Sequence, residues 1–245
     1  MNEDLYTGST SRDVYMQPIA DEMQRLTGRP ADAVIRCGAE PEEIEYVVKK
    51  EFLPPQGKIR IGYPGTIIAE QTFAKILAAL KLLESRLPLP VEIHLFGNHS
   101  YRNRPWYDER VIVEHGYLPE DEMIRRYRSC DWGLVIMELD GSNPRYNQFT
   151  FPCKFTRALA DGLPIISVAH PETTLIRMAR KYQIGAVLTS PNEEALAEEL
   201  LPWLSGATKL PGQRDEMLRC IKTEFDAEAN RRILYALLNA SARTA

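Results

Sequence analysis

Along the middle of the chain, short apolar runs alternate with longer segments in which apolar residues recur at helical spacing. Val91–Phe96 is of the first kind, and Gln71–Ser85, with Phe73, Ile76 and Leu80 on one face, is of the second. The short runs predict strands at 58–63, 91–96, 111–113, 132–137, 164–168 and 186–188. The periodic segments predict helices at 71–85, from 119 onward, and at 152–161, 172–182 and 193–204.

Largely apolar strands that alternate with helices call for a parallel sheet covered by helices on both faces. Crossovers in such sheets are right-handed, so we predict an α/β fold with a doubly wound, Rossmann-like parallel sheet. The flanks differ in pattern. Residues 1–52 contain a helical stretch at 14–26, an extended piece at 33–36 and a short acidic helix near Pro41, and residues 226–240 form an amphipathic helix. We therefore divide the chain into 1–52, 53–225 and 226–245.

Composition removes several classes of function. The chain has 245 residues and a net charge of −4, which gives no electrostatic reason to expect a nucleic-acid partner. No apolar run approaches the roughly 20 residues of a membrane span, and residues 1–11 lack the apolar segment of a signal peptide. The expected location is the cytoplasm, with peripheral attachment to the inner membrane face left open. The four cysteines show no metal-ligand spacing, so no metal site is expected: Cys37, Cys130, Cys153 and Cys220.

In a doubly wound sheet, ligands bind beyond the carboxyl ends of the strands. The loop after the first core strand contains Gly65, which permits close approach of backbone to a ligand, and Thr66, which offers a hydroxyl. An ordinary strand-to-helix turn explains both residues equally well. The spacing is not GxGxxG, so no dinucleotide fingerprint is present.

The loop after the fourth strand, 138–151, is long enough to suggest a function. We expect Ser142, Asn143 and Arg145 to contact substrate there. The helix that follows begins at Pro152 and has Lys154 in its first turn, where a cation opposes the helix dipole unless it faces an anion. A surface lysine that extends into solvent is the alternative.

Other side chains on the ligand side have simpler explanations. His170 follows the fifth strand and could meet hydroxyls of a ligand, but a histidine before a helix start is expected there as well. Glu138 and Asp140 are explained equally by ligand binding and by a solvated loop. Within the sheet, His94 is expected to be a packed histidine. Packing within their loop is also the preferred explanation for Trp106 and Tyr107.

The segment Phe151–Ile166, FPCKFTRALADGLPII, resembles the signature of family-4-like GT-B glycosyltransferases, in which a Pro-x-Lys helix runs into Ala-x-Gly-x-Pro and a strand. Val111–Leu118, VIVEHGYL, is similar to the strand and glycine turn that contact the base in that family. Gln183–Leu188, QIGAVL, resembles its late strand. The similarity covers residues 58–204.

This resemblance implies the nucleotide-sugar-binding, C-terminal half of a glycosyltransferase of the hexosyltransferase type. Gly65 and Thr66 would approach the diphosphate or sugar, Tyr117 and Leu118 would line the base pocket, and Lys154 would lie near the phosphates. The nucleotide sugar is a substrate, and no metal or other cofactor is implied, because protein cations and helix dipoles stabilise the leaving diphosphate.

The resemblance also implies partners. A complete enzyme of this kind would need about as many residues again upstream, to bind a glycan or lipid-linked acceptor. That half would be absent here, because the chain is truncated or because a separate chain supplies it. Helices shaped for a missing half could also cause the chain to form a homo-oligomer.

Two departures from the family pattern put catalysis in question. Arg157 and Phe149 stand where the family has its pair of glutamates, the second of which holds the ribose hydroxyls. An arginine cannot accept a hydrogen bond, so Arg157 is expected to contact phosphate instead. Glu70 or Gln71 stands where the family has a lysine that neutralises diphosphate. The alternative function is therefore a non-catalytic nucleotide-binding or protein-interaction module with this fold.

Overall fold

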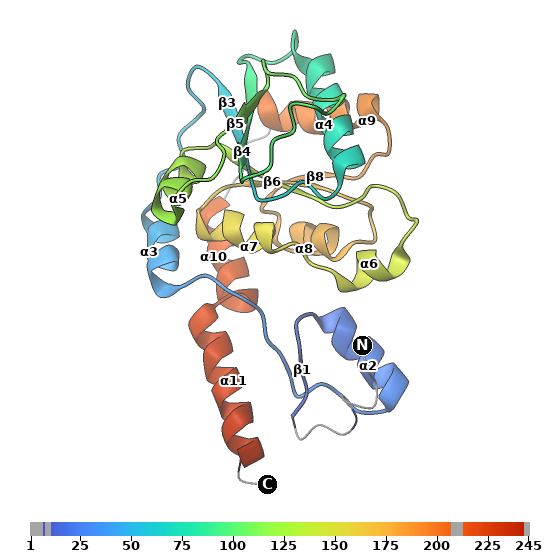
Figure 1. Ribbon diagram of the computed structural model, residues 1–245. Coiled ribbons are helices and arrows are strands. Elements are labelled where there is room, and N and C mark those ends of the chain that lie inside the picture. The colour runs from blue at the N-terminus through green and yellow to red at the C-terminus, as the bar shows by residue number, and fades with distance from the viewer. Residues whose placement is uncertain (1–6, 8–10, 207–212, 243–245) are drawn as a thin grey trace.

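The computed structural model describes residue 7, residues 11–206 and residues 213–242. Its centre is a six-stranded sheet in which every neighbouring pair is parallel. The strands are β3 (Ile59–Pro64), β4 (Val91–Phe96), β5 (Ile112–Glu114), β6 (Trp132–Ile136), β7 (Ile165–Val168) and β8 (Gly185–Leu188), as Figure 1 shows. All six correspond to the predicted strands within one or two residues.

The strand order is β5-β4-β3-β6-β7-β8. The chain enters at the middle of the sheet in β3, winds outward to β5, and then returns to β6 on the other side of β3. This reversal confirms the doubly wound fold. It also defines a switch point between β3 and β6, where the loops after the two strands diverge and leave room for a ligand.

Helices cover both faces of the sheet (Figure 1). Helices α4 (Glu70–Leu83) and α9 (Glu193–Leu204) pack together on one face. On the other lie α5 (Glu120–Arg128), α7 (Cys153–Ala160) and α8 (Thr174–Tyr182), with α3 (Pro41–Lys49) and α10 (Gln213–Glu224) packed against them. Alternate strand residues enter separate cores: Ile93 and Leu95 face α4, whereas Phe96 belongs to the cluster on the α7 side. The largely apolar strands are explained by this double burial.

Two helices differ from the sequence-based expectation. Helix α6 (Pro144–Phe149) lies inside the segment predicted to be a loop, and it begins where the Asn143 side chain accepts a hydrogen bond from the Tyr146 N–H at 3.0 Å. Helix α10 was not predicted. Its buried residues Met217, Cys220 and Ile221 do have helical spacing, but charged residues surround them.

The flanks form smaller elements. Strands β1 (Asp13–Val14) and β2 (Ala33–Val34) make a short parallel pair connected through α2 (Gln17–Thr27). Helix α11 (Ala227–Ala242) extends away from the sheet (Figure 1). It exposes a set of large apolar side chains, namely Ile233, Tyr235 and Leu238.

A buried carboxylate joins three helices on the α7 side of the sheet. Asp161, which directly follows α7, has no exposed surface and accepts hydrogen bonds from Arg157 at 2.6 and 2.7 Å and from Arg128 of α5 at 2.8 Å. Arg157 also pairs with Glu43 of α3 at 2.8 Å. The Lys50 ammonium, just beyond α3, donates to the Asp161 carbonyl at 3.1 Å. The network therefore fixes α3, α5 and α7 relative to one another.

Replacing this carboxylate should destabilise the fold. Asp161→Asn keeps the side-chain volume but leaves two half-buried guanidinium groups without their common anion, so we expect the free energy of unfolding in urea to fall by about 3 kcal/mol. Glu198→Gln is the control, because Glu198 pairs with Arg86 at the surface and its loss should leave the urea midpoint unchanged. Equal effects of the two substitutions would contradict a structural role for the Asp161 network.

Candidate ligand-binding site

The turn after β3 packs closely against the neighbouring loop. Gly65 has φ +85°, a conformation that favours glycine, and its N–H donates to the Phe96 carbonyl at 2.6 Å. A Cβ placed on Gly97, in the loop after β4, would lie only 3.6 Å from the Gly65 backbone. The carboxyl ends of β3 and β4 thus form one compact rim.

Lys154, in the first turn of α7, reaches this rim from a distant part of the sequence. A Cβ on Gly65 would lie 3.6 Å from both its Cε and its Nζ, and Nζ lies 5.1 Å from the centre of the Tyr63 ring. Within residues 11–206 and 213–242, Lys154 makes no ion pair with a carboxylate. Burial lowers the pKa of this lysine. A half-buried cation without an anionic partner, beside the uncapped N-terminus of α7, is suited to binding an anion.

Thr66 lies at the same rim. It is exposed, and its Oγ1 is 3.4 Å from His99 Nδ1 in the loop after β4. Its carbonyl accepts a hydrogen bond from the Tyr63 hydroxyl at 3.2 Å. The structure therefore brings together Gly65, Thr66 and Lys154, and their contact with a phosphate stays a prediction.

The loops after β6 and β7 are held to the start of α4 by a buried threonine. Thr72 Oγ1 donates to Glu138 Oε2 and accepts from the Leu139 N–H, both at 3.2 Å. Burial raises the pKa of Glu138, and nearby Asp140 adds to the effect. The His170 N–H in turn donates to the Glu138 carbonyl at 3.0 Å. Thr72 was not among the predicted site residues; its sequence signal is a hydroxyl on the apolar face of α4.

The remaining predicted residues on the long loop make local contacts. Ser142 Oγ donates to Asp140 at 2.8 Å, and Asn143 caps α6. Arg145, on α6, lies near Glu22 of α2. A hydrogen bond from Arg25, with a smaller contribution from Arg145, lowers the pKa of Glu22. Contact of this loop with a substrate stays a prediction.

Tyr117 and Leu118 follow β5, where Gly116 has φ +69°. Tyr117 is 81% exposed, whereas Leu118 packs against the core. Since β5 lies two strands from β3, these residues are roughly 10 Å across the sheet from the Gly65 rim. That separation allows one extended ligand to contact both places. The base pocket itself stays a prediction.

The predicted phosphate contact of Arg157 is not supported. Its guanidinium is paired with Asp161 and Glu43, because the Asp161 carboxylate, four residues later and just beyond the end of α7, is fully buried. Phe149, at the other altered glutamate position, ends α6 and is half-buried. Glu70 pairs with Arg104 at 2.7 Å. Arg157 is therefore a structural residue here.

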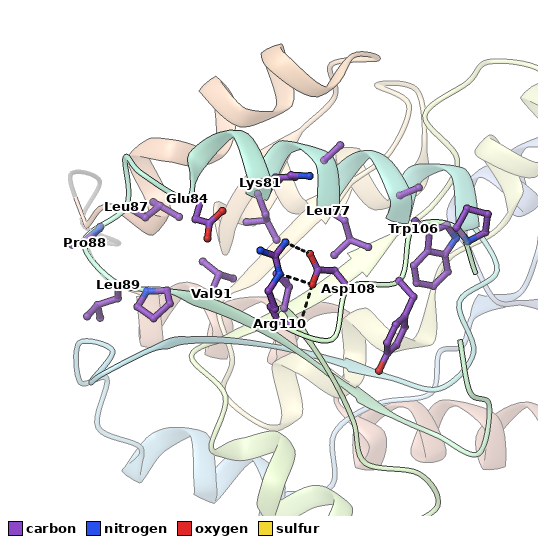
Figure 2. Close-up of a pocket in the computed structure, with 17 residues that line it drawn as sticks. Leu77, Lys81, Glu84, Leu87, Pro88, Leu89, Val91, Trp106, Asp108 and Arg110 are labelled. Carbon is purple, nitrogen blue, oxygen red and sulfur yellow. Dashed lines mark hydrogen bonds and ion pairs between the residues drawn. The ribbon is translucent and has the colours of Figure 1, made fainter. Parts of the chain in front are cut away.

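A separate groove of about 620 Å³ lies at the amino-terminal ends of the strands (Figure 2). It runs between α4, from Leu77 to Glu84, and the segment 105–111 before β5. The crossover from β4 to β5 contains no helix, so this side of α4 has no helical neighbour. The Trp106 ring packs on Phe73 of α4 at 5.1 Å and on Tyr101 of its own loop at 5.5 Å between ring centres, in agreement with a packing role. The groove is at the amino ends of the strands, away from Gly65 and Lys154.

The described part of the chain contains neither a membrane-spanning helix nor a metal-binding cluster. In residues 11–206 and 213–242, no helix is both long and apolar enough to cross a membrane. The same described part of the chain has no group of three or more histidine, cysteine or acidic residues positioned to hold a metal ion. Its four cysteines are free, and Cys37 and Cys153 are exposed.

The sheet order defines a Rossmann-like α/β domain, and the glycine turn and the Lys154 helix form a candidate ligand site at the carboxyl ends of its strands. A family model described as glucosyltransferase 3-like, C-terminal domain, matches residues 76–200, about half of the chain. The chain belongs to this family. No curated protein matches it in sequence.

Solved structures with the same fold are GT-B glycosyltransferases. An α,α-trehalose 6-phosphate synthase from Burkholderia multivorans is 12% identical, with a TM-score of 0.65 over 99% of this chain and 62% of its own. A glycosyltransferase from Rickettsia africae is 11% identical, with a TM-score of 0.66 over 99% and 67%. WaaG, a glycosyltransferase of lipopolysaccharide biosynthesis, is 13% identical, with a TM-score of 0.62 over 92% and 62%. The chain spans less than two thirds of the length of the first of these.

Two half-buried lysines should respond in opposite ways to the loss of charge. Lys154→Met removes a desolvated cation that has no carboxylate partner, so we expect unchanged stability or a gain of up to about 1 kcal/mol. Lys50→Met is the matched control: burial lowers the pKa of Lys50 to about 8, but its ammonium donates to the Asp161 carbonyl, and its loss should destabilise the fold. Urea unfolding measures both. A clear loss of stability in Lys154→Met would mean that this lysine is structural.

Proposed function

We propose that this chain is the nucleotide-sugar-binding domain of a glycosyltransferase that transfers a sugar to a glycan or lipid-linked acceptor. The observation that carries the proposal is the half-buried Lys154 against the Gly65 turn, at the carboxyl edge of the sheet. Membership of a glucosyltransferase family and the GT-B neighbours support it.

In this proposal the diphosphate lies between the Gly65 turn and the first turn of α7. Lys154 supplies one positive charge there. The N-termini of α4 and α7 lack side-chain caps, so their free N–H groups can also face the phosphates. A negative phosphate would favour the charged form of the lysine and so oppose the effect of burial. As the bond to the sugar breaks, the same groups stabilise the charge that develops on the leaving diphosphate, with no metal required.

The rest of the donor would extend along the carboxyl edge of the sheet. The base would reach Tyr117 and Leu118 after β5, chiefly through their backbone groups. The sugar would face the loop with Ser142, Asn143 and Arg145. Acceptor binding would need a further domain or chain, since the solved relatives are longer than this chain. We also propose that copies of this chain can associate into a homo-oligomer through the exposed apolar residues of α11.

One observation favours a non-catalytic module instead. The position where a ribose-binding carboxylate is expected holds Arg157, and that side chain is committed to Asp161 and Glu43. Glu70 is likewise paired with Arg104. A domain in this state could bind a nucleotide through Lys154 and the helix termini without supporting transfer. Release of nucleoside diphosphate from a bound sugar nucleotide would exclude this alternative.

Thermal unfolding with UDP, GDP, ADP, CMP and their sugar conjugates tests donor binding. We expect one nucleotide family to raise the unfolding midpoint, since a ligand at about 100 times its Kd adds roughly 2.7 kcal/mol. Lys154→Met should weaken that nucleotide about tenfold or more, the equivalent of a lost charge-assisted hydrogen bond. Lys81→Met, at the opposite edge of the sheet, should bind normally. No response to any nucleotide at millimolar concentration, or equal losses in both variants, would refute the proposed site.

A further inference from the structure

A chain of polar side chains lies between the sheet and α5, where apolar packing is the usual arrangement. Glu92 and His94 project from β4 on the α5 side, and His115 follows β5 on the same face. His94 Nδ1 lies 3.0 Å from His115 Nε2, and His94 Nε2 lies 3.3 Å from Glu92 Oε2. At the other end, Arg126 of α5 lies 3.2 Å from His115 Nδ1. Four side chains from two strands and one helix are thus continuous.

The ends of this chain fix the direction of every hydrogen bond. Arginine can only donate, so neutral His115 accepts at Nδ1 and carries its proton on Nε2. That proton is donated to His94 Nδ1, which leaves the His94 proton on Nε2, facing the Glu92 carboxylate. Glu92 is also hydrogen-bonded by Lys58. Both histidines are therefore assigned as neutral Nε2–H tautomers.

A further proton has no place in this arrangement. On His94 it would sit on Nδ1 and face the His115 N–H. On His115 it would sit on Nδ1 and face the Arg126 guanidinium. Either proton breaks one hydrogen bond of the chain. Burial lowers the pKa of His94 from the usual 6.5, although Glu92 opposes the effect. Burial is also the largest cause that lowers the pKa of His115, and the nearby His94 and Arg126 add to it.

Surrounding charges do not offset this preference for neutral rings. Lys58 and Arg60 of the β3 side both disfavour a charged His94, while Asp131 lies on the same face and accepts from the Arg60 N–H at 2.7 Å. On α5, Glu122 accepts from Arg126 Nε at 3.0 Å, which keeps that guanidinium in place. Burial would raise the pKa of Glu92, but Lys58 and His94 together hold it below its usual value. The carboxylate therefore stays charged as the histidines begin to titrate.

The hydrogen-bonded chain of side chains is attached to the loop that contains Tyr117 and Leu118. His115 directly precedes Gly116, and its ring stacks on Phe96 at 4.6 Å with an interplanar angle of 5°. Arg126 belongs to α5, which begins at Glu120, immediately after the loop. Both ends of the 116–119 loop are thus tied together by the His115 to Arg126 hydrogen bond. The exposed Tyr117 has little packing of its own to fix it.

We propose that His94 and His115 are positioning residues that hold the Gly116–Leu118 loop for nucleotide binding, and that acid releases this loop by breaking their hydrogen-bonded chain. The proposal rests on the proposed donor site. The direction of the pH dependence follows from the geometry. The hydrogen-bonded chain of neutral side chains is intact above pH 6.5, and it is lost as the pH falls through the lowered pKa of His94 and His115. Below that pKa, the apparent Kd for the nucleotide should rise about tenfold for each pH unit, since binding of one proton removes the loop conformation that binds the nucleotide.

The first test needs no nucleotide. The chain has four histidines, so their ring nitrogens can be resolved by ¹⁵N NMR in the intact protein. We expect Nε2–H tautomers for His94 and His115 at pH 7.5, and changes in the Gly116, Tyr117 and Leu118 amide signals that follow the titration of these two rings. The opposite tautomer in either ring, or loop amides that do not respond as the rings titrate, would overturn the proposal.

A matched pair of arginine variants tests the cause. Arg126→Gln removes the cation and the obligatory donor at His115 Nδ1, so His115 should titrate at higher pH and the loop should loosen at that higher pH. Arg125→Gln changes the exposed neighbour on α5, which makes a long contact of 3.7 Å with Glu122, and should leave the His115 titration unchanged. Identical His115 titration curves for the two variants would refute the hydrogen-bonded chain as the cause of loop release.

Binding of UDP-glucose between pH 5 and 8 completes the test. A sugar diphosphate lacks the terminal phosphate that titrates near pH 6, so its own charge is constant. We expect affinity to fall on acidification in the wild type, the fall to begin at higher pH in Arg126→Gln, and a nearly flat profile in His115→Gln. A flat wild-type profile with measurable binding would overturn the coupling. Absence of binding at every pH would refute the donor site instead, and the NMR titration would still decide the loop.

Discussion

The Asp161 carboxylate is the contact on which the geometry of the carboxyl edge depends. It is fully buried and draws Arg157 and Arg128 towards the end of α7, with α3 joined through Glu43. Because these bonds fix one end of an eight-residue helix, they also set the position of its other end, where Lys154 meets the Gly65 turn. A stability network and a candidate binding residue therefore share one short, rigid element.

The same network accounts for an arginine at position 157, where the resemblance to family-4-like enzymes implies a glutamate. An arginine there supports the helix from the protein side and cannot serve a ribose. The cation at Lys154 is then left to act with backbone N–H groups rather than with a neighbouring carboxylate. In our proposal such a site would favour a phosphate over a sugar hydroxyl, since the lysine ammonium and the free N–H groups of the helix termini are donors. Anion recognition is accordingly the property that we propose for these strand ends.

The doubly wound parallel sheet could be inferred from sequence because most of its strands are largely apolar and most of its crossovers contain a segment of helical period. The meeting of Gly65 and Lys154 was also accessible, through the rule that ligands bind at carboxyl ends. Helix α6 was missed because its start depends on one asparagine cap, and α10 because charges surround three buried residues. The role of Arg157 was misjudged, since nothing local reveals that Asp161 is buried. The Thr72 and His94 contacts join segments whose proximity only the fold creates.

The pairing of β3 with its two neighbours has a consequence for how the chain folds. Ile59 pairs with Val91, about 30 residues away, whereas Ile61 pairs with Trp132, about 70 residues away. The entropy of closing the longer loop differs by only about 0.7 kcal/mol, but the second pairing also requires β5 and α5 to have turned the chain back. We expect β3, α4 and β4 to assemble first during synthesis and the junction with β6 to close late. Binding of a ligand at the junction of β3 and β6 would then report that folding of the domain is complete.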